Sequence, residues 1–141
     1  MPVTQRLGIR LAGVRSGGVR LRAPFAANTN HAGTAFAGSL NAVATLAGWA
    51  TVWLLLREHD IRGQVVIQDS SVRYLRPVTG DFEAVSTPPS HEAITHLLHS
   101  VTRRGKGRIE LAISVHDHQG EAVQFRGRYV ALRDAKGRPP P

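Results

Sequence analysis

The sequence predicts an α+β domain in which a curved antiparallel sheet wraps around one long central helix. The helix is indicated by the run from Ala42 to Leu56, where fifteen consecutive residues carry no charge. This run is shorter than the stretch of about 20 apolar residues that crosses a bilayer. It is apolar nearly all round, so other elements must cover most of its surface. Segments with alternating apolar and polar residues, such as 108–117, can form that cover as half-buried strands.

Composition limits the kind of protein further. The 141 residues are 42% apolar, which suffices for one domain with a real core, 1–134, followed by a tail at 135–141 that we expect to be disordered. Cysteine is absent, so the chain has neither disulfides nor a cysteine–zinc site. The first residues lack the apolar segment of a signal peptide, and we therefore expect a cytoplasmic protein that does not enter a membrane.

The charge of the chain restricts its partners. The formal net charge of +8 favours an acidic partner, and nucleic acid, anionic lipid, coenzyme A phosphates or an acidic carrier protein would all fit it. Only 6% of residues are aromatic, whereas single-stranded nucleic-acid sites stack bases on exposed aromatic rings, so we do not expect nucleic acid. His96 with His99 and His116 with His118 each lack a matched third ligand nearby, so we expect no metal site.

Turn and cap residues divide the chain into elements. Ser16-Gly17-Gly18 is typical of a hairpin turn, and Gly63 ends the central helix. Ser90 is a good N-cap for a second helix that begins at His91 and stops at Gly105. The expected strands are 7–14, 18–23, 64–75, 82–86, 108–117 and 122–132. A single sheet of this kind leaves exposed edges, which pairing commonly hides, so we expect a homodimer, with a tetramer as an alternative.

A polar loop before the central helix is the candidate site. It carries Asn28 and Asn30 and leads into small residues at a helix start, where free N–H groups and the positive dipole end lie. No Asp or Glu occurs from residue 25 to residue 57. Both asparagines could equally be turn residues with Asx hydrogen bonds. Simpler structural roles also exist for three further polar residues, His31, Ser39 and Thr45.

Three motifs resemble the hotdog fold of the thioesterase superfamily. They are PFAANTNHAGTAFAGSL at 24–40 leading into LAGWATVWLL at 46–55, DSSVRYLRPVTGD at 69–81, and QFRGRYVAL at 124–132. Together they are similar to a small family labelled as thioesterases, found alone or fused behind an acetyltransferase domain. Within that family the chain looks closest to malonyl-acyl carrier protein decarboxylases, which supply acetyl-carrier protein for fatty-acid synthesis. Relatives have an extra N-terminal helix, whereas this chain starts near its first strand, so we expect one pocket wall to be absent or built differently.

The resemblance suggests a mechanism without a carboxylate. Hydrolytic hotdog enzymes resemble one another in a His-Gly-Gly turn followed by a carboxylate on the central helix, which activates water or attacks the thioester. Here the corresponding turn reads Phe36-Ala37-Gly38, and the helix position falls near Thr45. Decarboxylation needs no such carboxylate, because malonyl supplies its own leaving carbon dioxide and the enzyme must stabilise an enolate with neutral donors. The resemblance aligns Asn30 as the active-site amide, and we expect it to donate to the enolate oxygen together with the Gly38 N–H.

The remaining candidates leave three functions open. Asp69 could act as a base, or it could pair with Arg73. Cations from several segments could meet at the site mouth and bind a phosphopantetheine phosphate or an acidic carrier helix. The expected substrate-binding residues are Asn28, His31, Phe36, Ser39, Arg73, Arg76, Arg103, Arg104 and Lys106. No cofactor is expected, since the substrate carries phosphopantetheine itself. The chain could be a decarboxylase of carrier-protein or coenzyme A thioesters, a thioesterase that uses Asp69 or Thr45, or a non-catalytic acyl-thioester binding module.

Overall fold

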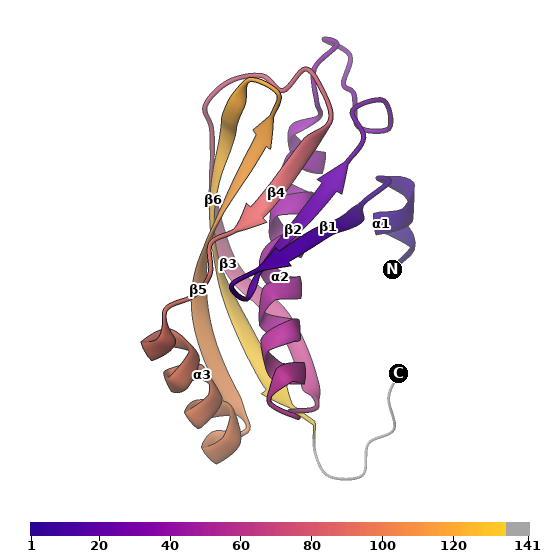
Figure 1. The fold of residues 1–141 in the computed structure, drawn as a ribbon. Coiled ribbons are helices and arrows are strands. Elements are labelled where there is room, and N and C mark those ends of the chain that lie inside the picture. The colour runs from indigo at the N-terminus through magenta and orange to yellow at the C-terminus, as the bar shows by residue number, and fades with distance from the viewer. Residues whose placement is uncertain (135–141) are drawn as a thin grey trace.

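The computed structural model describes residues 1–134, and the tail for which we expect disorder, 135–141, lies outside the described residues. The elements in chain order are α1 (Pro2–Arg6), β1 (Arg10–Arg15), β2 (Gly18–Ala23), α2 (Ala37–Glu58), β3 (Gly63–Tyr74), β4 (Phe82–Ser86), α3 (His91–Arg104), β5 (Lys106–Asp117) and β6 (Gly120–Arg133). The six strands form one antiparallel sheet in the order β1-β2-β4-β5-β6-β3. This sheet curves around α2 (Figure 1), which confirms the predicted fold.

The central helix α2 forms the core with the inner face of the sheet. Ten of its residues are buried, from Ser39 to Leu56, on more than one side of the helix. Such a helix is stable only when covered, and here the sheet supplies the cover. By length and composition α2 could cross a membrane, but 56% of its most apolar window is buried inside this fold. Thr51 ties α2 to β2, since its hydroxyl donates to the Ala47 carbonyl and accepts from the Val19 N–H.

The strand β5 shows how the sheet separates an inner from an outer face. Its inward residues, from Ile109 to Val115 in steps of two, are buried, while Arg108 before them and Glu110 among them are exposed. This is the alternation that the sequence predicts for a half-buried strand. The outer face carries the ion pairs Arg20–Glu83, Arg126–Glu110 and Arg128–Asp69 between neighbouring strands, and Arg22 pairs with Asp81 just before β4. Exposed pairs of this kind contribute about 0–1 kcal/mol each, so the outer face is a solvated surface.

The beginning of the chain differs from the sequence prediction. The first strand begins at Arg10 rather than at residue 7, because residues 2–6 form the one-turn helix α1. Backbone bonds from Leu7 to Val3 and from Gly8 to Gln5 close this turn. Proline at the first helical position has no N–H to satisfy, which suits Pro2.

Candidate functional site

The loop from Phe25 to Phe36 folds as a small hairpin ahead of α2. Thr29 and Ala35 form an isolated antiparallel bridge. The Phe36 N–H donates to the Asn28 carbonyl at 2.7 Å and closes the base of the hairpin. The chain therefore enters α2 from a defined, hydrogen-bonded loop rather than from an irregular one.

The side chain of Asn30 organises the tip of this loop. Its Oδ1 accepts from the Ala32 N–H at 2.9 Å and from the Thr34 N–H at 3.1 Å, which is an Asx-type arrangement. Its Nδ2 donates to Thr34 Oγ1 at 2.9 Å and lies 3.5 Å from the Ala35 carbonyl. The second contact is at the limit of hydrogen-bond length, so one Asn30 N–H is only weakly engaged.

Asn28 anchors the loop instead of facing a ligand. The residue is 2% exposed, and its Nδ2 donates to the Leu7 carbonyl at 2.9 Å and to the Pro24 carbonyl at 2.7 Å. Its amide N–H groups thus fasten the loop to the segment before β1, and the contact of Asn28 with substrate stays a prediction. Among residues 1–134, no partner is present for its buried Oδ1.

The start of α2 presents free backbone donors to solvent. The N-cap Phe36 makes no side-chain capping bond, and the first turn holds no acidic residue. Its carbonyl accepts from Ser39 and Leu40, whereas the N–H groups of Ala37 and Gly38 have no acceptor within the described chain. These two donors lie at the positive end of the helix dipole. All three residues from Phe36 to Gly38 are exposed, so the terminus can receive an anionic group.

Two aromatic side chains border this terminus. The Phe36 ring lies over Gly38 so closely that a Cβ there would approach its Cζ to 2.7 Å. From the end of β3, the Tyr74 hydroxyl donates to the Ala37 carbonyl at 3.2 Å. Tyr74 is a site residue that the sequence analysis missed, although it lies within the motif at 69–81. His31 is exposed on the loop, and Ser39 is buried within the first turn.

An apolar cleft of about 480 Å³ opens farther along α2. Its walls come from α1, α2 and the inner face of the sheet, with Val3, Ala42, Thr45, Trp49, Ile67 and Tyr129 among the lining residues. Ala42 lies about 8 Å along the helix axis from Ala37, which is about one and a half turns of α2. The short helix α1 forms one wall of this cleft. The sequence predicts that one pocket wall is absent or built differently, and α1 is the element found at that end of the chain.

Tyr129 connects the cleft wall to the helix backbone. This fully buried residue of β6 donates its hydroxyl to the Thr45 carbonyl at 2.9 Å, and burial raises the pKa of the phenol. The ring packs against Gly48, where a Cβ would approach its Cζ to 2.5 Å. Thr45 itself is half-buried at the cleft.

The expected general base Asp69 lies on the opposite side of the sheet. It is the register partner of Arg128, whose guanidinium contacts its carboxylate at 3.2 Å on the outer face. The neighbouring β6 residue Tyr129 points inward to α2. Within one protomer Asp69 therefore has the structural role of an ion-pair partner, and its role as a base stays a prediction. Arg73 lies four residues farther along the strand on the same outer face, and its contact with substrate also stays a prediction.

The cations that we expected to meet at one mouth lie at two ends of the molecule. Arg76 is bound to Asp117 at the end of β5, whereas Lys106 begins that strand and Arg103 and Arg104 end α3 beside it. Twelve residues of strand separate the two groups, a span of about 36 Å. Arg103, Arg104 and Lys106 therefore do not contact a substrate held at the α2 terminus of the same protomer.

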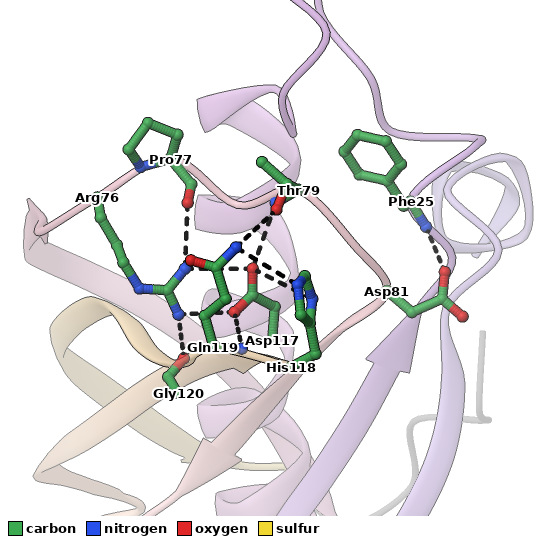
Figure 2. A network of polar contacts seen from close by, with 9 residues as sticks. All are labelled: Phe25, Arg76, Pro77, Thr79, Asp81, Asp117, His118, Gln119 and Gly120. Carbon is green, nitrogen blue, oxygen red and sulfur yellow. Dashed lines mark hydrogen bonds and ion pairs between the residues drawn. The ribbon is translucent and has the colours of Figure 1, made fainter.

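Arg76 has a structural partner instead of a phosphate. Its guanidinium donates to both carboxylate oxygens of Asp117, at 2.6 and 3.2 Å, and also to the Gly120 carbonyl. The Asp117 side chain is fully buried and accepts further bonds from the Thr79 and Gln119 N–H groups (Figure 2). The hydrogen bond from Arg76 is the largest cause holding the pKa of Asp117 well below its usual range, against the effect of burial. Arg76 thus has a structural role in this chain, and its contact with substrate stays a prediction.

No metal site is apparent in the described chain. Within residues 1–134 no group of three or more His, Asp or Glu side chains converges in a way that could hold an ion.

A curved antiparallel sheet wrapped around one long central helix defines a hotdog fold. The chain belongs to the family described as "Putative thioesterase (yiiD_Cterm)", whose model matches residues 1–133. A crystal structure described as a putative thioesterase from Shewanella oneidensis is 32% identical with a TM-score of 0.83, covering 94% of this chain and 89% of that one. A probable thioesterase from Pseudomonas aeruginosa is 30% identical, with a TM-score of 0.81 and coverage of 95% and 89%. A protein of unknown function from Chlorobaculum tepidum is 28% identical, with a TM-score of 0.90 and coverage of 95% and 88%.

Proposed function

We propose that this protein decarboxylates malonyl thioesters, with malonyl-acyl carrier protein as substrate and acetyl-acyl carrier protein as product. The observation that carries the proposal is the α2 terminus, where two backbone donors are free and no carboxylate is available. The chain has no acid from residue 25 to residue 57, and Asp69 lies on the outer face. Asp81 and Asp117, which contact the segment before β4 and the site loop, both accept hydrogen bonds.

The reaction requires the enzyme to stabilise a developing negative charge, and it does not require a general base. The bond between the malonyl methylene carbon and its carboxylate breaks, and carbon dioxide leaves. The electron pair of that bond enters the thioester as an enolate, whose oxygen carries the negative charge. The methylene carbon then takes one proton from water to give the acetyl thioester. In this proposal the free Ala37 and Gly38 N–H groups donate to the enolate oxygen, and each such donor is worth about 10²–10³ in turnover.

Asn30 is the side-chain donor in this proposal. One of its N–H groups is held by Thr34, and the other makes only the 3.5 Å contact with the Ala35 carbonyl. Ala35 directly precedes the N-cap residue of α2, so a modest movement of this amide toward the helix terminus would add a third neutral donor. The enolate would stabilise the moved amide, because hydrogen bonds to charged groups are about twice as strong as neutral ones.

The test is mass spectrometry of purified protein incubated with malonyl-carrier protein and, in parallel, acetyl-carrier protein. Loss of carbon dioxide with the thioester intact supports the decarboxylase. Release of the free carrier thiol from either substrate refutes it in favour of a thioesterase. No product from either substrate, together with saturable binding, would instead indicate a binding module. Parallel reactions with malonyl-coenzyme A identify the donor.

A thioesterase acting on aliphatic acyl groups is the second candidate, and the apolar cleft favours it. A malonyl carboxylate would be desolvated in this cleft without a cationic partner, whereas an alkyl chain gains about 0.8 kcal/mol per buried methylene. Hydrolysis that accelerates with acyl length, by about fourfold per methylene at subsaturating substrate, would support this candidate. Ala42→Leu should narrow the cleft and remove the preference for long chains, and a flat chain-length profile in the unaltered protein would contradict it.

We further propose that the protein is a homodimer paired through β3. This edge strand of twelve residues leaves one row of backbone groups unpaired and exposes Val66 and Ile67. Ile67→Lys should yield monomers in light scattering, while Leu11→Lys on the opposite edge strand β1 should not. The reverse result would place the interface at β1. A cytoplasmic location belongs to the same proposal, because the substrate carrier is a soluble acidic protein.

A further inference from the structure

The segment 75–81, which connects β3 to β4, lies between the β5–β6 turn and the site loop. On the β5–β6 side, Arg76 and the Thr79 N–H both bond the Asp117 carboxylate, and Gln119 Nε2 donates to Thr79 Oγ1 at 3.1 Å. Figure 2 shows these groups converging on Asp117, with Asp81 at the other end of the segment. The β5–β6 turn therefore holds this segment at several points.

The other side of the same segment holds the site loop at both of its ends. The Val78 carbonyl accepts from the Ala35 N–H at 2.8 Å. The Asp81 carboxylate accepts from the Phe25 N–H at 2.9 Å. Ala35 immediately precedes the N-cap of α2, so the position of Val78 determines where the helix terminus lies.

We propose that Arg76 and Asp117 are positioning residues, which fix the site loop and the α2 terminus by holding segment 75–81 in place. The inference rests on the proposed site at the start of α2. The path runs from the buried Asp117 carboxylate through the Arg76 guanidinium and the Thr79 N–H to the Val78 carbonyl, and from there to Ala35. None of these groups touches the reacting atoms.

Position matters at this site because backbone donors cannot adjust as side chains can. A shift of about 1 Å in a catalytic group can reduce turnover about 10²-fold. Donors that act only on the developing enolate charge affect kcat, while the binding of the carrier arm depends on other contacts. Loss of the Arg76–Asp117 contacts that hold segment 75–81 should therefore lower kcat by about 10- to 100-fold and change KM by less than about threefold.

The variants are Arg76→Ala, Arg76→Lys and Asp117→Asn, with Arg126→Gln as the matched control. Arg126 forms an ion pair with Glu110 on the outer face and has no contact with segment 75–81 in the described structure. Lysine cannot bridge two carboxylate oxygens and a carbonyl in a planar fork, so Arg76→Lys should recover only part of the loss. If Arg76→Ala turns over like Arg126→Gln, the proposal is wrong.

Amide hydrogen exchange by NMR gives a readout that does not require activity. The Ala35 and Phe25 N–H groups should exchange at least about tenfold faster in Arg76→Ala, while the Val52 amide in the middle of α2 should follow global stability alone. Uniform acceleration of all three amides, with kcat retained, would show a merely structural role and overturn the proposal. If the unaltered protein turns over no thioester, the proposed function fails. The exchange rate of the Ala35 amide in Arg76→Ala then still tests whether Arg76 holds segment 75–81 in place.

Asp81 supplies a second test should Asp117→Asn fail to fold. Its side chain is half exposed, so substitution is tolerated more easily. Asp81→Asn keeps an oxygen for the Phe25 N–H, whereas Asp81→Ala removes it. Faster Phe25 exchange and lower kcat in the alanine variant alone support positioning through this bond. If both variants change Phe25 exchange and kcat equally, the lost charge is the cause, and positioning through the Asp81–Phe25 bond is contradicted.

Discussion

Replacing Asn30 by alanine or by aspartate separates its role in the loop from its role in chemistry. Alanine removes two acceptor bonds, from Ala32 and Thr34, and the donor bond to Thr34 Oγ1. Three neutral hydrogen bonds together contribute about 3 kcal/mol, and because Ala32 is exposed and can bond water, we expect a loss of about 1–2 kcal/mol. Aspartate keeps both acceptor bonds and loses only the donor, so it should cost about 1 kcal/mol or less.

Turnover should not follow this order of stability. Both variants lack the amide donor, so each should lose about 10²–10³ in kcat. Aspartate should be at least as impaired as alanine, because its negative charge opposes the enolate that must form. Thermal unfolding and malonyl-carrier protein turnover are to be measured on both proteins below their transition temperatures. If Asn30→Asp keeps turnover within a few-fold of the unaltered protein, Asn30 is a turn residue and the assignment fails.

The remaining predictions concern two glycines of α2 and one buried acid. Gly38→Ala should raise stability by up to about 1 kcal/mol through helix propensity, while the exposed ring over it moves and turnover falls. Gly48→Ala should destabilise the fold by about 1–3 kcal/mol, because the fully buried Tyr129 ring cannot move away. Urea unfolding should therefore show changes in the free energy of unfolding of opposite sign for Gly38→Ala and Gly48→Ala, and changes of the same sign would contradict this packing. The Arg76 hydrogen bond lowers the pKa of Asp117, so its stabilisation is complete above about pH 4 and is lost as pH falls toward the folded pKa. Urea midpoints between pH 7 and 2.5 should therefore fall less steeply for Asp117→Asn, and parallel curves would contradict this.

Long elements were predictable from the sequence because each carries its own periodic pattern. The fifteen uncharged residues indicate α2, and the strict alternation from Ile109 to Val115 indicates β5. The helix α1 carries no such signal. Five residues are fewer than an isolated helix needs, so it depends on contacts that no local pattern contains.

The pairing of Arg76 with Asp117 was beyond sequence reasoning for a different reason. The two residues are 41 positions apart and meet only because β3 and β5 lie on either side of β6 in the sheet. A motif that contains an arginine next to a proline and a glycine suggests a ligand-binding loop equally well. The strand order decides between the two interpretations, and the strand order is a property of the whole fold.

A bulge in β3, one extra residue in the strand, decides which side chains of β3 face α2. Inward positions run through Val65 and Ile67, so uninterrupted alternation would place Asp69 inward as well, facing α2. The register shifts between Ile67 and Asp69, and every later residue of the strand changes face. Asp69 consequently pairs with Arg128 outside, and Tyr74 turns inward to reach the Ala37 carbonyl. The bulge therefore keeps the Asp69 carboxylate on the face of the sheet that points away from α2, and it brings the neutral Tyr74 hydroxyl to the start of that helix.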